Sequence, residues 1–141
     1  MEAALEGLGD AAETTRVIAI TQLTSTSPEA LKTEQLVDVP LVESVRNYAK
    51  LAQAAGLAGV VCSAHEAADI ASVTGPNFLR VTPGIRPAGS AVGDQSRVAT
   101  PGNAASMGSS AIVVGRPRTK ADFQVAAYHA IRDDWNAGRK A

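Results

Sequence analysis

Short apolar runs alternate with longer amphipathic stretches along the whole chain. The apolar runs are continuous instead of alternating with polar residues, which is typical of parallel strands buried on both faces. They lie at residues 17–21, 59–62, 78–81 and 110–114. We therefore expect four strands, each followed by helical sequence.

Several predicted helices begin with recognisable capping residues. Ser27 and Thr100 each precede a proline, which places a hydroxyl at the cap and proline at the first helical position. Ser63 and Glu66 have the spacing of a capping box. The expected helices cover residues 1–8, 28–37, 40–56, 64–73, 100–108 and 119–136, the last capped by Thr119, with a polar connector at 11–16. The first helix has no cap before it, so we expect it to continue from a longer element.

This order of elements predicts a parallel sheet, because alternating strands and helices form right-handed crossover units. Two architectures compete, namely a small open doubly wound sheet and half of a (β/α)8 barrel. A full barrel needs about 250 residues, and this chain has 141. Since the loops after the last two barrel strands frequently bind phosphate, we expect a single α/β domain at residues 1–141. It would form the carboxyl-terminal half of a TIM barrel, with strands equivalent to the fifth to the eighth.

Composition excludes several classes of function. Apolar residues make up 45% of the chain, and the formal net charge is −1, so no polybasic surface favours nucleic acid. No apolar run approaches the roughly 20 residues of a membrane span, and we expect no signal peptide in the amino-terminal residues. The single cysteine, Cys62, excludes an internal disulfide and fits a reducing cytoplasm, where we expect the protein.

The loop at about residues 83–100 is the most distinctive stretch of the chain. It is rich in glycine and proline, and loops of more than about a dozen residues are usually lids or binding loops. Its polar residues Arg86, Asp94, Gln95 and Arg97 form a set suited to holding an anion. The alternative for Arg86 is an ion pair with Asp94, and for Gln95 a solvated position.

Other strand ends carry further candidates. Gly115 would let a phosphate approach the backbone while Arg116 binds it with two hydrogen bonds, although Arg116 could instead be a surface arginine in an ion pair. Thr24 and Ser25 follow the first strand and could bind a ligand, but hydroxyls in turns are more often local caps. Cys62 is expected in the core. The two histidines and one cysteine give no metal-ligand spacing, so no metal is expected.

Five blocks of this sequence resemble the bacterial orotidine 5′-phosphate decarboxylase family. They are Val-Ile-Ala-Ile-Thr-Gln-Leu-Thr-Ser-Thr at 17–26, Gly-Val-Val-Cys-Ser at 59–63, Val-Thr-Pro-Gly-Ile-Arg-Pro at 81–87, Gly-Asp-Gln at 93–95 and Val-Gly-Arg-Pro at 114–117. The resemblance implies a (β/α)8 barrel, usually dimeric, that converts orotidine 5′-phosphate to UMP and CO2 in pyrimidine biosynthesis without a cofactor.

The resemblance also implies roles for six residues. Thr24 would line the nucleotide site, with Ser25 near the pyrimidine. Arg86 and Gln95 would lie on the lid over the phosphate. Gly115 would offer its backbone amide to the phosphate and Arg116 its guanidinium.

The family's charged array, Asp-x-Lys-x-x-Asp with a further lysine before it, has no counterpart in this sequence. The lysines, Lys32, Lys50, Lys120 and Lys140, fall in predicted helices or at the tail. We therefore assign no catalytic residue and expect the chain alone to be inactive. Two other functions remain open, a non-catalytic phosphate-binding half-barrel and another barrel enzyme such as a phosphate-ester isomerase.

Half a barrel leaves two strand edges and one face of the sheet uncovered. Open edges favour pairing with another chain, and covering several hundred Å² of apolar surface is worth roughly 10 kcal/mol at about 25 cal/mol per Å². We therefore expect a homo-oligomer, association with the missing amino-terminal half, or a sheet that rearranges and stays open.

Overall fold

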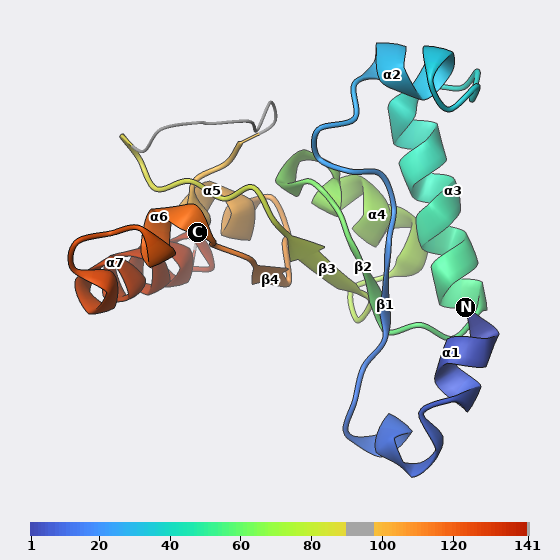
Figure 1. Ribbon diagram of the computed structural model, residues 1–141, viewed down its shortest axis with the longest axis horizontal. Coiled ribbons are helices and arrows are strands. Elements are labelled where there is room, and N and C mark those ends of the chain that lie inside the picture. The colour runs from blue at the N-terminus through green and yellow to red at the C-terminus, as the bar shows by residue number, and fades with distance from the viewer. Residues whose placement is uncertain (90–97, 141) are drawn as a thin grey trace.

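The computed structural model describes residues 1–89 and 98–140 and contains one parallel sheet (Figure 1). Its strands lie in the order β1 (Ile18–Ile20), β2 (Gly59–Val61), β3 (Leu79–Thr82) and β4 (Ala111–Ile112). Every neighbouring pair is parallel. The expected parallel sheet is thus confirmed, although the strands are shorter than the apolar runs. Pairing continues past the end of β4, since the main-chain nitrogen of Val113 donates to the Thr82 carbonyl at 2.8 Å.

Two short helices precede β1, and at least one helix follows each strand. They are α1 (Glu2–Glu6), α2 (Pro28–Thr33), α3 (Leu41–Ala54), α4 (Ala67–Thr74), α5 (Pro101–Ser106), α6 (Arg116–Thr119) and α7 (Gln124–Gly138), with short 3-10 helices η1 (Gly9–Glu13) and η2 (Ala64–Glu66). In Figure 1, α3 lies near β1 and α5, α6 and α7 gather beside β4. None of these helices is long and apolar enough to cross a membrane.

The predicted helix starts are confirmed at three caps. The Ser27 hydroxyl accepts from the main-chain nitrogen of Ala30 at 3.0 Å, and the Thr100 hydroxyl accepts from that of Asn103 at 3.2 Å. The main-chain nitrogen of Ser63 donates to the Glu66 carboxylate at 2.9 Å. These signals are local, so the sequence was enough to place them.

The two ends of the chain differ from expectation. Thr119 is not the cap of the last helix; it ends the short helix α6, in which Pro117 takes an early helical position. The chain then turns, and α7 begins only at Gln124, whose side chain donates to the Thr119 carbonyl at 2.9 Å. Near the amino terminus, α1 ends at Glu6 and the expected polar connector begins with the 3-10 helix η1.

One face of the sheet is covered and the other is open. Val60 and Cys62 point to the covered face and are fully buried with Val45, Ala49, Ala52 and Ile70 of α3 and α4. Tyr48 of α3 is exposed, because the buried stripe of this helix runs through Ala49. Because side chains alternate along a strand, Ile20 and Val113 lie on the other face, where they are 59% and 51% exposed.

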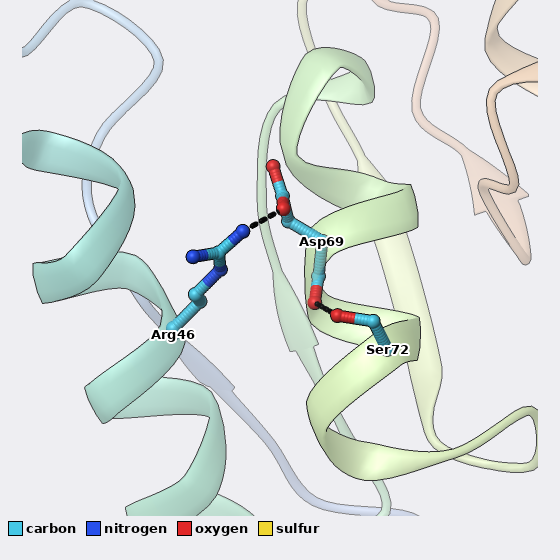
Figure 2. Close-up of polar contacts among 3 residues, drawn as sticks. All are labelled: Arg46, Asp69 and Ser72. Atoms are coloured by element: carbon cyan, nitrogen blue, oxygen red, sulfur yellow. Dashed lines mark hydrogen bonds and ion pairs between the residues drawn. The ribbon is translucent and has the colours of Figure 1, made fainter.

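An ion pair joins α3 and α4 on the outside of the covering layer. Figure 2 shows the Arg46 guanidinium of α3 pointing to the Asp69 carboxylate of α4, with which it is hydrogen-bonded. The Ser72 hydroxyl donates to the Asp69 carbonyl one turn further along α4, at 2.7 Å. Both charged side chains are more than a third exposed, so the pair contributes little to the stability of the fold.

A buried arginine lies at the amino-terminal ends of the strands, opposite the edge formed by their carboxyl ends. Arg80 of β3 is only 8% exposed. Its guanidinium donates to the carbonyl oxygens of Phe78 at 2.6 Å and Gly108 at 2.8 Å, and more weakly to those of Gly75 and Pro76 at 3.4 Å. These carbonyls belong to the two connections that enter β3 and β4. Arg80 therefore joins these connections through hydrogen bonds to carbonyls.

Candidate functional site

The carboxyl ends of the four strands form one edge of the sheet, because all four strands are parallel. In folds of this kind, ligands bind at that edge. Four segments leave the sheet there, at residues 21–26, 62–63, 83–86 and 113–116. In Figure 1, α2 follows β1 beyond this edge, whereas η1 lies at the opposite end. Five of the six predicted site residues lie in or directly beside these segments.

The segment after β1 is a tight turn that presents Thr24 and Ser25. The main-chain nitrogen of Thr26 donates to the Leu23 carbonyl at 2.9 Å, which closes the turn around these two residues. Thr24 is half-buried and Ser25 is exposed. Before the turn, the Thr21 hydroxyl donates to the Val61 carbonyl at 3.1 Å. The turn is therefore joined directly to β2.

Gln22 anchors this turn from the other side, a role that the sequence analysis did not assign. Its side-chain nitrogen donates to the Gln35 amide oxygen at 3.1 Å and to the Ser44 hydroxyl at 3.2 Å. The Gln35 amide nitrogen donates back to the Gln22 amide oxygen at 3.1 Å. The only signal in the sequence is an amide placed directly after a buried strand, which by itself is weak.

The segment after β3 closes the base of the long loop. Gly84 has φ 77°, a left-handed conformation that favours glycine. Ile85 is fully buried and forms a parallel bridge with Ala99, and the main-chain nitrogen of Arg86 donates to the Ala99 carbonyl at 2.9 Å. The two ends of the loop thus meet at the sheet edge.

Arg86 sits at this base and is only 8% exposed. Its guanidinium donates to the Ile85 carbonyl at 2.9 Å, so the charged end is folded back along the loop base. Gln95 lies outside the described residues, as do Asp94 and Arg97. The loop predicted at 83–100 is therefore described at both its ends, and the assignment of Gln95 stays a prediction.

The segment after β4 leads into α6. Gly115 is exposed, and a Cβ atom built on it would meet no other atom within 4 Å. Its carbonyl accepts from the main-chain nitrogens of Arg118 and Thr119, at 2.9 and 3.0 Å. Arg116, expected at a strand end, is instead the first residue of α6 and is exposed. The strand-to-helix turn thus leaves open space over the Gly115 backbone beside a guanidinium.

The described residues offer few groups for other chemistry. No three or more His, Cys, Asp or Glu side chains among them lie close enough to hold a metal ion. Cys62 is fully buried in the core, as expected, whereas His65 is exposed. A thiol buried in apolar surroundings is inert as a nucleophile, so we assign Cys62 no chemical role.

A groove of about 330 Å³ lies beside the open edge of β4. It is lined by side chains of β4, its following segment, α6 and α7: Ile112, Val114, Arg118, Tyr128, Ile131, Arg132 and Trp135. Because Ile112 points to the face of the sheet that the helices cover, the groove lies on that same face, beyond the last strand. It is separate from the turn that carries Thr24.

The chain is similar to known proteins over nearly all its length. The model of the family described as "Orotidine 5'-phosphate decarboxylase / HUMPS family" matches residues 1–131. Orotidine 5′-phosphate decarboxylase from Cutibacterium acnes is 97% identical over 141 residues, which are 100% of this chain and 60% of that protein. The enzyme from Streptococcus uberis is 56% identical over 137 residues, 97% of this chain and 58% of that protein.

Solved structures agree with this similarity. A crystal structure of orotidine 5′-phosphate decarboxylase from Lactobacillus acidophilus matches with a TM-score of 0.79 and 42% identity, over 96% of this chain and 58% of that one. An uncharacterised conserved protein from Geobacillus kaustophilus matches with a TM-score of 0.77 and 42% identity, over 96% and 57%. The chain thus spans about 60% of the length of the first of these relatives and slightly less of the others.

Proposed function

The chain belongs to the orotidine 5′-phosphate decarboxylase / HUMPS family, and we propose that it carries the part of such an enzyme that binds the phosphate and nucleoside of its ligand. Membership confirms the family expected from the five sequence blocks, and the similarity to a solved decarboxylase confirms the predicted class, part of a TIM barrel. The ligands would be orotidine 5′-phosphate and its product UMP. The main support for this proposal is a shared position at one edge of the sheet, where Thr24, Arg86, Gly115 and Arg116 all lie.

In this proposal the phosphate lies over the turn after β4. The open space above Gly115 lets a phosphate oxygen reach the backbone, and Arg116 supplies a planar guanidinium that can bind two oxygens at once. Arg86 contributes a second positive charge at the loop base. Gln95 would add an amide donor from the lid at residues 83–100. We propose that the whole chain acts as one domain.

The Thr24–Ser25 turn would contact the nucleoside. Hydroxyl groups both donate and accept hydrogen bonds, which suits the mixed donors and acceptors of a pyrimidine edge. The turn leaves the sheet from β1, at the far side from β4 in the strand order. A nucleotide lying along the sheet edge would therefore place its phosphate and its base at different strands.

The decarboxylation itself would need groups from outside this chain. Loss of CO2 leaves an electron pair on the pyrimidine ring carbon, which must then take up a proton. Arginine side chains keep their protons under ordinary conditions, and the threonine and serine hydroxyls are weak acids. The assigned residues of this sheet edge are thus suited to binding, and we propose that the chain alone does not decarboxylate its ligand.

The missing groups would come from a partner that also completes the fold. Within the described residues β1 pairs only with β2 and β4 only with β3, so each has an unpaired edge. Ile20 and Val113 are exposed on the open face between these edges. We propose a complementary polypeptide with parallel strands as the partner; a homo-oligomer of this chain is the alternative. The single, buried Cys62 supports a cytoplasmic location.

The test is a decarboxylation assay with and without such a complement. The chain would be mixed with a polypeptide that covers the remaining part of the Cutibacterium acnes relative, and conversion of orotidine 5′-phosphate to UMP would be followed. We expect no turnover by either part alone and turnover by the mixture. Turnover by the 141-residue chain alone would contradict the proposal that the catalytic groups lie outside it.

A further inference from the structure

The side chain of Gln22 is buried and joins its own turn to α3 and to the connection between α2 and α3. It is 6% exposed, as is Ser44 of α3, to which its amide nitrogen donates. The same amide forms a reciprocal pair with Gln35, which lies in the connection between α2 and α3. Both the donor and the acceptor of the Gln22 carboxamide are therefore used, and its orientation is fixed by three hydrogen bonds.

These bonds fix one end of the turn that carries Thr24 and Ser25. The other end is fixed by Ser27, whose hydroxyl caps α2. Between these two points the main-chain bond from Thr26 to Leu23 closes the turn. The path of the turn over the sheet edge is thus set by how Gln22 and Ser27 are held.

Packing alone would not set this orientation. Leu31 of α2 and Val45 of α3 are fully buried and supply the apolar contacts that hold these helices. Apolar contacts are non-directional, whereas hydrogen bonds weaken steeply when they are misaligned. The amide pair therefore contributes direction to a region whose stability comes from other side chains.

We propose that Gln22 is a positioning residue, whose carboxamide holds the Thr24–Ser25 turn in the orientation that binds the nucleoside, with no part in binding the phosphate. The inference rests on the proposed function, because it assigns the nucleoside to this turn. The proposed role separates the affinity for the nucleoside from the affinity for the phosphate. Gln22 would affect the binding of UMP and leave the binding of inorganic phosphate at Gly115 and Arg116 unchanged.

The experiment compares two ligands on the 141-residue chain by NMR titration, UMP and inorganic phosphate. In Gln22→Met, which keeps the length of the side chain and removes its hydrogen bonds, we expect affinity for UMP to fall about three- to tenfold, as for the loss of one or two hydrogen bonds. Affinity for phosphate should not change. Gln53→Met is the matched control, because Gln53 also joins two elements, donating to the Thr74 carbonyl at 2.6 Å, at the other end of α3.

A second variant keeps the test decisive if Gln22→Met does not fold. Gln35→Met removes the partner of Gln22 at an exposed position, where a substitution disturbs the fold less. It should weaken the binding of UMP and leave the binding of phosphate unchanged. Equal losses of affinity for UMP and phosphate, or unchanged affinity for UMP in both variants, would overturn this inference and leave the proposed function standing. If the unchanged chain binds neither ligand, the proposed function falls, and this inference falls with it.

Discussion

Asp134 of α7 accepts a hydrogen bond from the main-chain nitrogen of Gly102 in the first turn of α5, at 3.0 Å. The two helices approach closely here, since a Cβ atom on Gly138 would lie 2.1 Å from the Gly102 carbonyl oxygen. A carboxylate at a helix amino terminus pairs with unsatisfied amides and with the helix dipole. The last helix thus caps the helix that follows the long loop.

Removing this carboxylate should destabilise the fold. For Asp134→Ala we expect the free energy of unfolding, measured with urea, to fall by about 1 kcal/mol. Asp133→Ala is the control, because Asp133 pairs with its exposed neighbour Arg132 and its loss should cost less than about 0.5 kcal/mol. Equal effects of the two substitutions would show that the contact with Gly102 has no energetic role.

Gly59 is required where β2 meets β3. A Cβ atom at this position would lie 2.4 Å from both the Cβ and the carbonyl oxygen of Leu79, its partner in the parallel register. Gly59→Ala should therefore force the strands apart and cost about 1 to 3 kcal/mol in urea unfolding. Gly7→Ala, where the nearest atom would lie at 3.3 Å, should be tolerated. A neutral Gly59→Ala would mean that the strands are less closely paired than described.

Arg80 should matter for stability and not for ligand binding. Arg80→Met removes the hydrogen bonds to the Phe78 and Gly108 carbonyls and leaves them buried without a partner. We expect a loss of about 2 to 3 kcal/mol in urea unfolding, with the affinity for inorganic phosphate unchanged in the folded fraction. A weakened phosphate affinity would contradict the separation between the two ends of the sheet.

The fluorescence of Trp135 should change when the complementary polypeptide binds. It is the chain's single tryptophan and lines the groove beside the open edge of β4. A strand added at this edge would cover the groove, so the complement should reduce quenching of Trp135 fluorescence by acrylamide. A complement with proline in that strand, which removes a ladder hydrogen bond, should protect Trp135 less. Equal protection by both would argue against pairing at β4.

Much of the fold could be predicted because its signals are local. Continuous apolar runs marked the four strands, and Ser27, Ser63 and Thr100 marked helix starts through contacts within a few residues. The shared position of Thr24, Arg86 and Gly115 also followed from sequence, since parallel strands bring their carboxyl ends to one edge. Topology alone was enough for that inference.

The features that could not be predicted depend on distant partners. Gln22 meets Ser44, 22 residues away, and Arg80 meets the Gly108 carbonyl, 28 residues away. The break between α6 and α7 left Arg116 in a helix, because Pro117 favours an early helical position that the strand pattern did not show. The contacts of Gln22 and Arg80 depend on tertiary structure that a local pattern does not contain, whereas the helical position of Arg116 follows from the local preference of Pro117.

The central claim, a phosphate site at Gly115 and Arg116, is tested most directly by titrating the chain with UMP and comparing Arg116→Ala with Arg16→Ala. Both changes remove one exposed arginine, but Arg16 lies before β1, at the opposite end of the sheet. We expect Arg116→Ala to weaken UMP binding by about tenfold or more, as for loss of a charge-assisted hydrogen bond, and Arg16→Ala to have little effect. Unchanged affinity in Arg116→Ala, or equal losses in both variants, would contradict the claim.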